Sequence, residues 1–137
     1  MDKILIDSDV ILDFLFDRKP YADDASIVLS MCESGKIQGF VTPVIISNVY
    51  YILRRIARHE TVVKKLSGLL TIVDVLIIDK AILTRALDSG FSDFEDALQN
   101  YAAEESGNID LILTRNIKDY KKSRLGIMTP ENYLAGI

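Results

Sequence analysis

Lys3-Ile4-Leu5-Ile6-Asp7 opens the chain, and Ser8-Asp9 leads straight into apolar residues at helical spacing. A short apolar run that stops at an acidic residue is typical of a strand buried on both faces of a sheet. Serine and aspartate are residue types that cap helices, and the apolar positions that follow them continue until Pro20. This stretch therefore predicts a strand followed directly by a helix.

The rest of the chain repeats this alternation. Further strands are predicted at 39–41, 72–78, 110–114 and 126–130, and further helices at 22–32, 44–57, 59–70 and 80–87. A capping box at Ser92-Asp93-Phe94-Glu95 opens one more helix. Ile56 and Phe94 are expected on the buried faces of their helices, and Asp13 and Asp17 on the polar face of the first helix.

Strands that alternate with helices predict a parallel sheet covered by helices on both faces. We expect an α/β protein: a three-layer α/β/α sandwich with a mainly parallel central sheet of four to five short strands. The length of 137 residues, with 49% apolar residues, predicts a single domain over residues 1–137.

Bulk composition narrows the classes of function. The net charge of −4 argues against a broad electropositive surface for nucleic acid, although carboxylates gathered around a cation would lower the same count. No apolar run approaches the roughly 20 residues of a membrane span, and no signal-peptide pattern is present, so we expect a cytoplasmic protein without membrane contact. Cys32 is the single cysteine, which excludes an internal disulfide, and we expect it to be buried.

Polar residues follow two of the predicted strands at their carboxyl ends, where parallel sheets bind ligands. Asp7 follows the first strand, Asn116 and Asp119 follow the strand at 110–114, and Asp93 and Asp96 lie in the first turn of the capping-box helix. We therefore predict one site. Asn48, Ser8, Asp9 and Thr114 are candidate neighbours of this site.

Carboxylate and amide oxygens are the ligands that Mg²⁺ and Mn²⁺ prefer, whereas zinc favours His and Cys, of which the chain has one each. Carboxylates gathered within a few ångströms repel one another unless a cation neutralises them. A divalent ion held in this way can bind a phosphodiester oxygen and activate a water molecule, which is nuclease chemistry.

Four segments in order resemble the PIN-domain family, in particular its VapC-like toxin ribonucleases. They are Ile6-Asp7-Ser8-Asp9 with the residues up to Asp13, Thr42-Pro43 with the residues up to Asn48, Asp93-Phe94-Glu95-Asp96 with the residues up to Gln99, and Leu113-Thr114-Arg115-Asn116 with the residues up to Tyr120. The resemblance spans nearly the whole chain.

The resemblance implies a Mg²⁺- or Mn²⁺-dependent endoribonuclease that acts as the toxin of a toxin–antitoxin pair, with an antitoxin protein as partner and a homodimer as assembly. It implies that Asp7, Asp96 and Asp119 are metal ligands, with Asp93 and Asn116 completing the catalytic edge. Arg54, Arg55, Arg58 and Arg115 are the candidate phosphate contacts for an RNA substrate.

Two departures from the family pattern leave alternatives open. Asn48 stands where many PIN nucleases have a glutamate, and Asn116 stands where an aspartate is frequent. Because each replaces a charged oxygen with a neutral amide, the metal should bind more weakly, and a PIN-like RNA- or partner-binding module without activity is one alternative. The other is a haloacid-dehalogenase-type phosphatase, because Asp7-Ser8-Asp9 after an apolar strand imitates that family's nucleophile.

Overall fold

A computed structural model describes all of residues 1–137. The strands are β1 (Lys3–Ile6), β2 (Gln38–Val41), β3 (Val73–Val75), β4 (Leu111–Leu113) and β5 (Gly126–Met128). They form one sheet in the order β3-β2-β1-β4-β5, and all four pairings are parallel. The predicted parallel α/β architecture is therefore confirmed.

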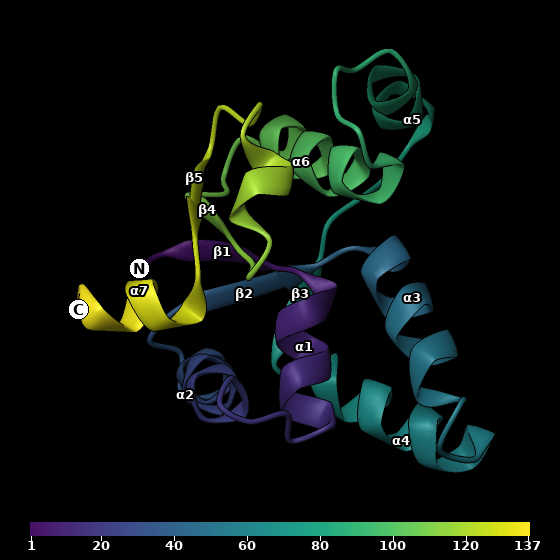
Figure 1. Cartoon of the computed structure of the whole chain (residues 1–137), viewed down its shortest axis with the longest axis vertical. Helices are drawn as coiled ribbons and strands as arrows, with labels where there is room; N and C mark the ends of the chain where they lie inside the picture. Colours follow the sequence, from purple (N-terminus) through teal and green to yellow (C-terminus); the bar gives the residue numbers. More distant parts are fainter.

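Helices cover both faces of this sheet (Figure 1). They are α1 (Ser8–Leu15), α2 (Ala22–Glu33), α3 (Pro43–Leu53), α4 (His59–Leu69), α5 (Lys80–Leu87), α6 (Phe94–Ser106) and α7 (Pro130–Ala135), with a 3₁₀ turn η1 (Ile117–Tyr120). In Figure 1, α1, α2 and α4 lie on one side of the strands and α5 and α6 on the other. None of these helices has the length and apolar character that crossing a membrane requires.

The two central strands of the sheet, β1 and β4, are deeply buried. The apolar residues of β1 and β4 have essentially no solvent exposure, apart from Leu111 at the start of β4. A strand buried on both faces needs a continuous apolar run rather than alternation, which is what the sequence at 3–6 provides. Cys32 is also buried, as predicted, and burial raises the pKa of its thiol to about 11.

Two predicted elements are shorter than expected by three residues or more, whereas the strands predicted at 110–114 and 126–130 are each shorter by two. The helix predicted at 44–57 ends at Leu53, and tight backbone hydrogen bonds from Arg55 to Ile52 and from Ile56 to Leu53 close it. Ile56 consequently leaves the buried face and is 71% exposed. The strand predicted at 72–78 covers only Val73–Val75, because β3 is an edge strand whose single neighbour, β2, ends at Val41.

The start of α6 also differs from the prediction. Asp93, rather than Ser92, is the N-cap, and its carboxylate accepts a hydrogen bond from the backbone N–H of Asp96 at 3.0 Å. The helix is shifted by one residue relative to the predicted capping box, so Phe94 lies in its first turn and is 45% exposed. Asp96 is thereby fixed through its own backbone.

Gly39 provides a test of how tightly the sheet packs. A Cβ atom at this position would lie 2.6 Å from Cys32 Sγ and 3.1 Å from the side chains of Ile6 and Val73. We expect Gly39→Ala to lower the free energy of unfolding by about 1–3 kcal/mol, because a packed core has to shift to admit the methyl group. Urea denaturation followed by circular dichroism measures this change.

Gly68 in α4 is the matched control, because a Cβ atom added there meets nothing within 4 Å. Gly68→Ala should leave the protein equally stable or up to about 1 kcal/mol more stable, since alanine favours helix. Equal effects of the two substitutions would contradict the packing described for β2.

Candidate active site

The candidate site begins where β1 and β4 end side by side. Ile6 is paired with Leu113 across the sheet, and the backbone N–H of Asp7 donates to the carbonyl of Leu113 at 3.0 Å. Asp7 and Thr114 therefore occupy the same edge although 107 positions separate them. The N-cap and the first turn of α6 bring Asp93 and Asp96 to the same place.

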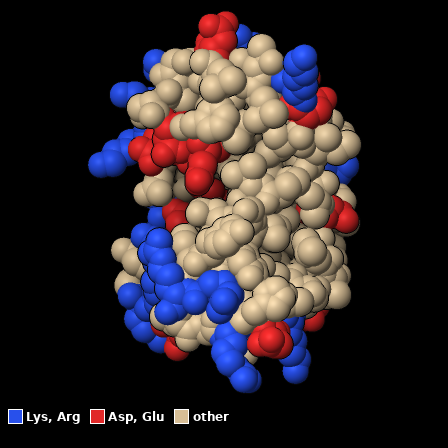
Figure 2. Space-filling model, turned by 90° about the vertical axis from the view of Figure 1, so that its right-hand side faces the viewer, with Lys and Arg blue, Asp and Glu red and all other residues tan.

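A cleft of about 300 Å³ lies between these elements. It is lined by five of the predicted site residues, Asp7, Asp93, Asp96, Asn116 and Asp119, and by Ser8, Asp9, Leu12, Arg18, Asn48, Glu95, Gln99 and Arg115. Figure 2 shows acidic side chains gathered around a hollow on this side of the molecule. The structure thus brings together residues that the sequence assigned to one site from four separate segments.

Asp7 is the most tightly held member. Its side chain is nearly buried, at 8% exposure, and one carboxylate oxygen accepts from the backbone N–H of Ser8 at 2.8 Å. The other oxygen accepts from the hydroxyls of Thr114 and Tyr120, both at 3.0 Å. Three donors therefore fix the orientation of this carboxylate before any ligand binds.

The electrostatics of the cleft are unfavourable to the ionised acids. Burial, followed by the negative charge of Asp9, raises the pKa of Asp7 to about 6. The pKa of Asp96 is raised to about 7 by burial and then by three neighbouring carboxylates, those of Asp7, Asp93 and Asp119. No basic side chain is among the causes for either group, so Asp7 and Asp96 lack a cationic partner.

Tyr120 connects the two central acids. Burial and the charges of Asp7 and Asp96 raise the pKa of its hydroxyl far above the usual range for tyrosine. The hydroxyl therefore stays protonated, and it donates a hydrogen bond to Asp7 at 3.0 Å. Because the charges of Asp7 and Asp96 both act on this hydroxyl and both acids line the cleft, they face a common space.

The sequence predicted Asp9 only as a neighbour of the site, but its carboxylate lines the cleft and is itself buried among site residues. One of its oxygens accepts from the backbone N–H of Arg115 at 2.9 Å and from Thr114 at 3.3 Å. The other oxygen, Oδ1, is buried and has no hydrogen-bond partner. Burial raises the pKa of this carboxyl group as well. An unpaired buried carboxylate oxygen is costly, and a bound cation is one way to satisfy it.

The prediction that Asp13 lies on the polar face of α1 is wrong. Its side chain is 2% exposed and forms ion pairs with Arg18 at 2.9 Å and with Arg115 at 2.6 Å. The pair between Arg115 and Asp13 is bidentate, because Nη2 of Arg115 also donates to Asp13 at 3.0 Å. Asp17 lies beyond the end of α1 with a positive φ of 53°. Arg18 and Arg115 are thus held at the rim of the acidic cleft.

The neutral amides occupy the positions where departures from the family pattern were noted. Asn48 lines the cleft and donates from Nδ2 to Ser8 Oγ at 3.4 Å. Asn116 is exposed at the mouth of the cleft, and its backbone N–H donates to Thr114 Oγ1 at 3.1 Å. Gln99, which the sequence analysis did not single out as a site residue, is buried beside them and accepts from Thr42 at 2.6 Å.

The other predicted phosphate contacts lie outside the cleft. Arg54, Arg55 and Arg58 are exposed around the turn between α3 and α4, and none of them lines the cleft. In Figure 2 basic side chains gather on the surface below the acidic hollow, on the half of the molecule that carries these two helices. Arg115 is the one predicted contact that reaches the site itself.

The donor set is compatible with a hydrated hard cation. No three His, Cys, Asp or Glu side chains form a group that could hold a metal ion by themselves. Mg²⁺ commonly keeps several water ligands and needs only one or two carboxylates from the protein. Two facing carboxylates with raised pKa values and a third with an unpaired buried oxygen meet that requirement.

The comparison with known families matches residues 3–118 to a family model described as PIN domain. Ribonuclease VapC1 of Aquifex aeolicus is 26% identical over 137 residues, which covers 96% of this chain and 93% of that protein. The matched range includes every acidic residue that lines the cleft except Asp119, which lies one residue beyond its end.

Solved structures share the fold at lower identity. A toxin–antitoxin complex from Klebsiella pneumoniae contains a chain that superposes with a TM-score of 0.68 at 20% identity, covering 93% of this chain and 97% of that one. The sarcin–ricin loop-cleaving toxin VapC20 of Mycobacterium tuberculosis gives a TM-score of 0.67 at 15% identity, covering 86% and 95%.

The raised pKa of Asp96 predicts how stability depends on pH. Its folded-state pKa of about 7 exceeds the ordinary value of 3.8, so the folded state binds this proton more tightly and stability falls as pH rises between these values. Asp96→Asn removes the charge. In EDTA at pH 8, we expect it to raise the free energy of unfolding by about 1–2 kcal/mol, since solvent in the open cleft screens part of the repulsion.

The same variant at pH 4 serves as the control, because Asp96 is then protonated in the folded wild-type protein and the gain should largely vanish. Thermal unfolding at both pH values measures the difference. An equal loss of stability at pH 4 and pH 8 would contradict a repulsive carboxylate cluster.

Proposed function

Because the chain belongs to the PIN-domain family, we propose that it is a metal-dependent endoribonuclease of the VapC type that hydrolyses RNA phosphodiester bonds. The observation that carries this proposal is the convergence of Asp7 and Asp96 on one cleft, where the pKa values of both are raised by burial and by neighbouring carboxylates. A curated relative with 26% identity over nearly its full length is named as a ribonuclease, which supports the same chemistry.

We assign Asp7 and Asp96 as the residues that would hold Mg²⁺ or Mn²⁺, with Asp119 as a further ligand directly or through water. Such an ion supplies a water molecule of lowered pKa and an electrostatic clamp on the phosphodiester oxygen. Thr114 and Tyr120 orient Asp7 by donating to its Oδ2 at 3.0 Å each. Asp93 fixes the backbone of Asp96, while Asn116 lies at the cleft mouth, placed to orient water.

The substrate would reach this acidic cleft along its basic rim. Arg18 and Arg115 are the guanidinium groups that line the cleft, and Asp13 holds both. Arg54, Arg55 and Arg58 extend positive charge over the α3–α4 turn, where they would contact phosphates farther along the RNA. Because Arg18 was not singled out from the sequence, the phosphate-binding set proposed from the structure is larger than the predicted one.

We further propose that the chain acts as the toxin of a toxin–antitoxin pair and binds an antitoxin protein. Several structures of similar fold are described as such pairs, including the complex from Klebsiella pneumoniae. A homodimer stays a prediction from the family resemblance. Asp7-Ser8-Asp9 gives no support to the phosphatase alternative, since Asp9 accepts hydrogen bonds from Arg115 and Thr114.

Asn48 and Asn116 keep the inactive binding module as the main rival. Both lie at the cleft, and as neutral amides they offset less of a cation's charge than carboxylates would. Asp7 and Asp96 carry no such substitution, and their repulsion is relieved only when a cation or a proton is present. This electrostatic demand favours the enzyme over the binding module.

Cleavage of RNA separates these functions. With Mn²⁺ and a 5′-labelled single-stranded RNA pool, the wild-type protein should cut RNA, and Asp7→Asn and Asp96→Asn should each lower the rate by about 100-fold or more. Each substitution removes a charge that would hold the ion and leaves the size of the side chain unchanged. Gel electrophoresis of the products measures the rates.

Asp23→Asn is the matched control, because Asp23 is an exposed acid on α2 outside the cleft and should leave the rate unchanged. Cleavage that persists at the wild-type rate in both site variants would refute the assignment. Binding of RNA without any cleavage by the wild-type protein would favour the binding module. Growth arrest on expression in bacteria, absent for Asp96→Asn, tests the toxin role.

A further inference from the structure

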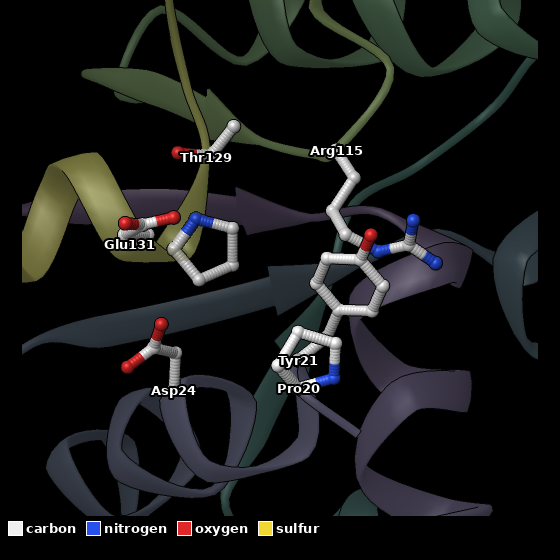
Figure 3. A pocket seen from close by; sticks show the side chains of 7 residues that line it. Pro20, Tyr21, Asp24, Arg115, Thr129 and Glu131 are labelled. Atoms are coloured by element: carbon white, nitrogen blue, oxygen red, sulfur yellow. The ribbon is translucent and has the colours of Figure 1, made fainter. Parts of the chain in front are cut away.

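A second pocket of about 590 Å³ lies next to the acidic cleft, between the start of α2 and the start of α7 (Figure 3). Arg115 lines both spaces, so the pocket and the cleft share one wall. Figure 3 shows the side chains in two groups that face each other across the pocket. One group is Pro20, Tyr21 and Arg115, and the other is Thr129 and Glu131, with Asp24 below them. Pro130, between Thr129 and Glu131 in the chain, also lines the pocket.

The shared wall is preformed. Arg115 binds the buried carboxylate of Asp13 through two hydrogen bonds of 2.6 and 3.0 Å, and its guanidinium lies 3.9 Å from the centroid of the Tyr21 ring. The tyrosine ring itself is 44% exposed. Pro130, by contrast, is buried and rigid. A flat aromatic surface and a proline ring thus border a space beside the cleft.

Two of the side chains that line the pocket are carboxylates. Asp24 and Glu131 both line it, and neither takes part in an ion pair within the chain. Two free carboxylates exclude a phosphate group, because like charges repel at short range. They suit a ligand that presents N–H donors, since an ionised carboxylate accepts hydrogen bonds and donates none.

We propose that this pocket binds a guanine base of the RNA substrate, in the nucleotide next to the phosphodiester that the acidic cleft cleaves. The inference rests on the proposed ribonuclease function and adds a sequence preference to it. Unpaired bases of RNA are recognised by stacking on aromatic or guanidinium planes and by hydrogen bonds to their edges. Tyr21 and Arg115 offer the planes.

Guanine fits the acceptors better than the other bases do. Its Watson–Crick edge presents an imino and an amino donor side by side, which one carboxylate can accept together. Uracil presents one imino donor between two carbonyl oxygens, and those oxygens would face the carboxylates of Asp24 and Glu131. Adenine and cytosine each offer an amino donor beside an unprotonated ring nitrogen, so they pair with a carboxylate at one point only.

A cationic side chain of a protein partner is the other ligand that two carboxylates attract. The guanidinium of Arg115 already lies against the Tyr21 ring, so an incoming cation would meet a positive charge at that wall. A neutral base can stack there without this repulsion. The arrangement therefore favours a nucleobase over a cationic side chain. The experiment below includes arginine amide to represent that cation.

The first arm measures binding without any need for cleavage. Backbone amide resonances of the full chain are followed by NMR during titration with GMP, IMP or UMP, which carry the same phosphate. GMP should shift the amides of Tyr21, Asp24, Thr129 and Glu131, and IMP, which lacks the 2-amino group, should do so with about tenfold weaker affinity. UMP should leave these amides unshifted.

The second arm measures cleavage with Mn²⁺ of two short single-stranded RNAs that differ only in having G or U at one position. The wild-type protein should cut next to G about tenfold faster, and Asp24→Asn with Glu131→Gln should abolish this preference. Asp23→Asn, an acid one position away that does not line the pocket, should retain it. Tyr21→Phe should retain GMP binding and Tyr21→Ala should lose it.

Equal shifts with GMP and UMP, or no shift at the pocket with either, would overturn the proposal. Shifts of these amides by arginine amide in the absence of an effect of GMP would also overturn it, in favour of a protein partner. GMP binding by a protein that cuts no RNA would support the base site while refuting the nuclease, so the two failures are distinguishable.

Discussion

Mutual repulsion among the carboxylates at one sheet edge is the constraint on which the rest of this structure depends. Asp7 and Asp9 lie at the start of α1 and Asp96 in the first turn of α6, yet all three line one cleft. Donors from Ser8, Thr114 and Tyr120 offset part of the repulsion at Asp7. The pKa values of Asp7 and Asp96 stay raised, first through burial and then through the neighbouring carboxylates, so these donors do not offset the full cost of ionisation.

This arrangement explains why a protein with a net charge of −4 can still act on a polyanion. The negative charge is concentrated in a cleft, where a divalent ion would reverse the local field, while basic residues gather on the neighbouring surface. Asp13 helps to keep the negative charge of the cleft apart from the basic side chains around it. As a buried acid it holds Arg18 and Arg115 at the rim, where they remain cationic and do not neutralise the central acids.

Most of the fold could be predicted from the sequence, because each short apolar run stops at a capping or turn residue and each helix carries a periodic apolar face. Element ends were less predictable. Ile56 continues the apolar spacing of α3 but lies outside it, since local backbone hydrogen bonds end the helix at Leu53. The acidic residues of the cleft could be grouped by the rule that parallel strands bind ligands at their carboxyl ends, although their catalytic roles stay predictions.

The supporting residues of the site were harder to predict, because their partners are distant in sequence. Asp13 has the spacing of a solvent-facing helix residue, and only Arg115, 102 positions later, makes it a buried ion-pair acceptor. Tyr120 looks like a core aromatic until its hydroxyl is placed between Asp7 and Asp96. A role for Gln99 in the site was only weakly indicated by the sequence, because Gln99 lies in the segment at 93–99 that carries the family resemblance.

The most direct test of the account is a crystal structure of the protein soaked in Mn²⁺, with anomalous diffraction recorded at the manganese absorption edge. The account predicts one strong anomalous peak within coordinating distance of both Asp7 and Asp96. A peak bound to only one of these residues, or none in the cleft at a concentration that supports activity, would contradict it.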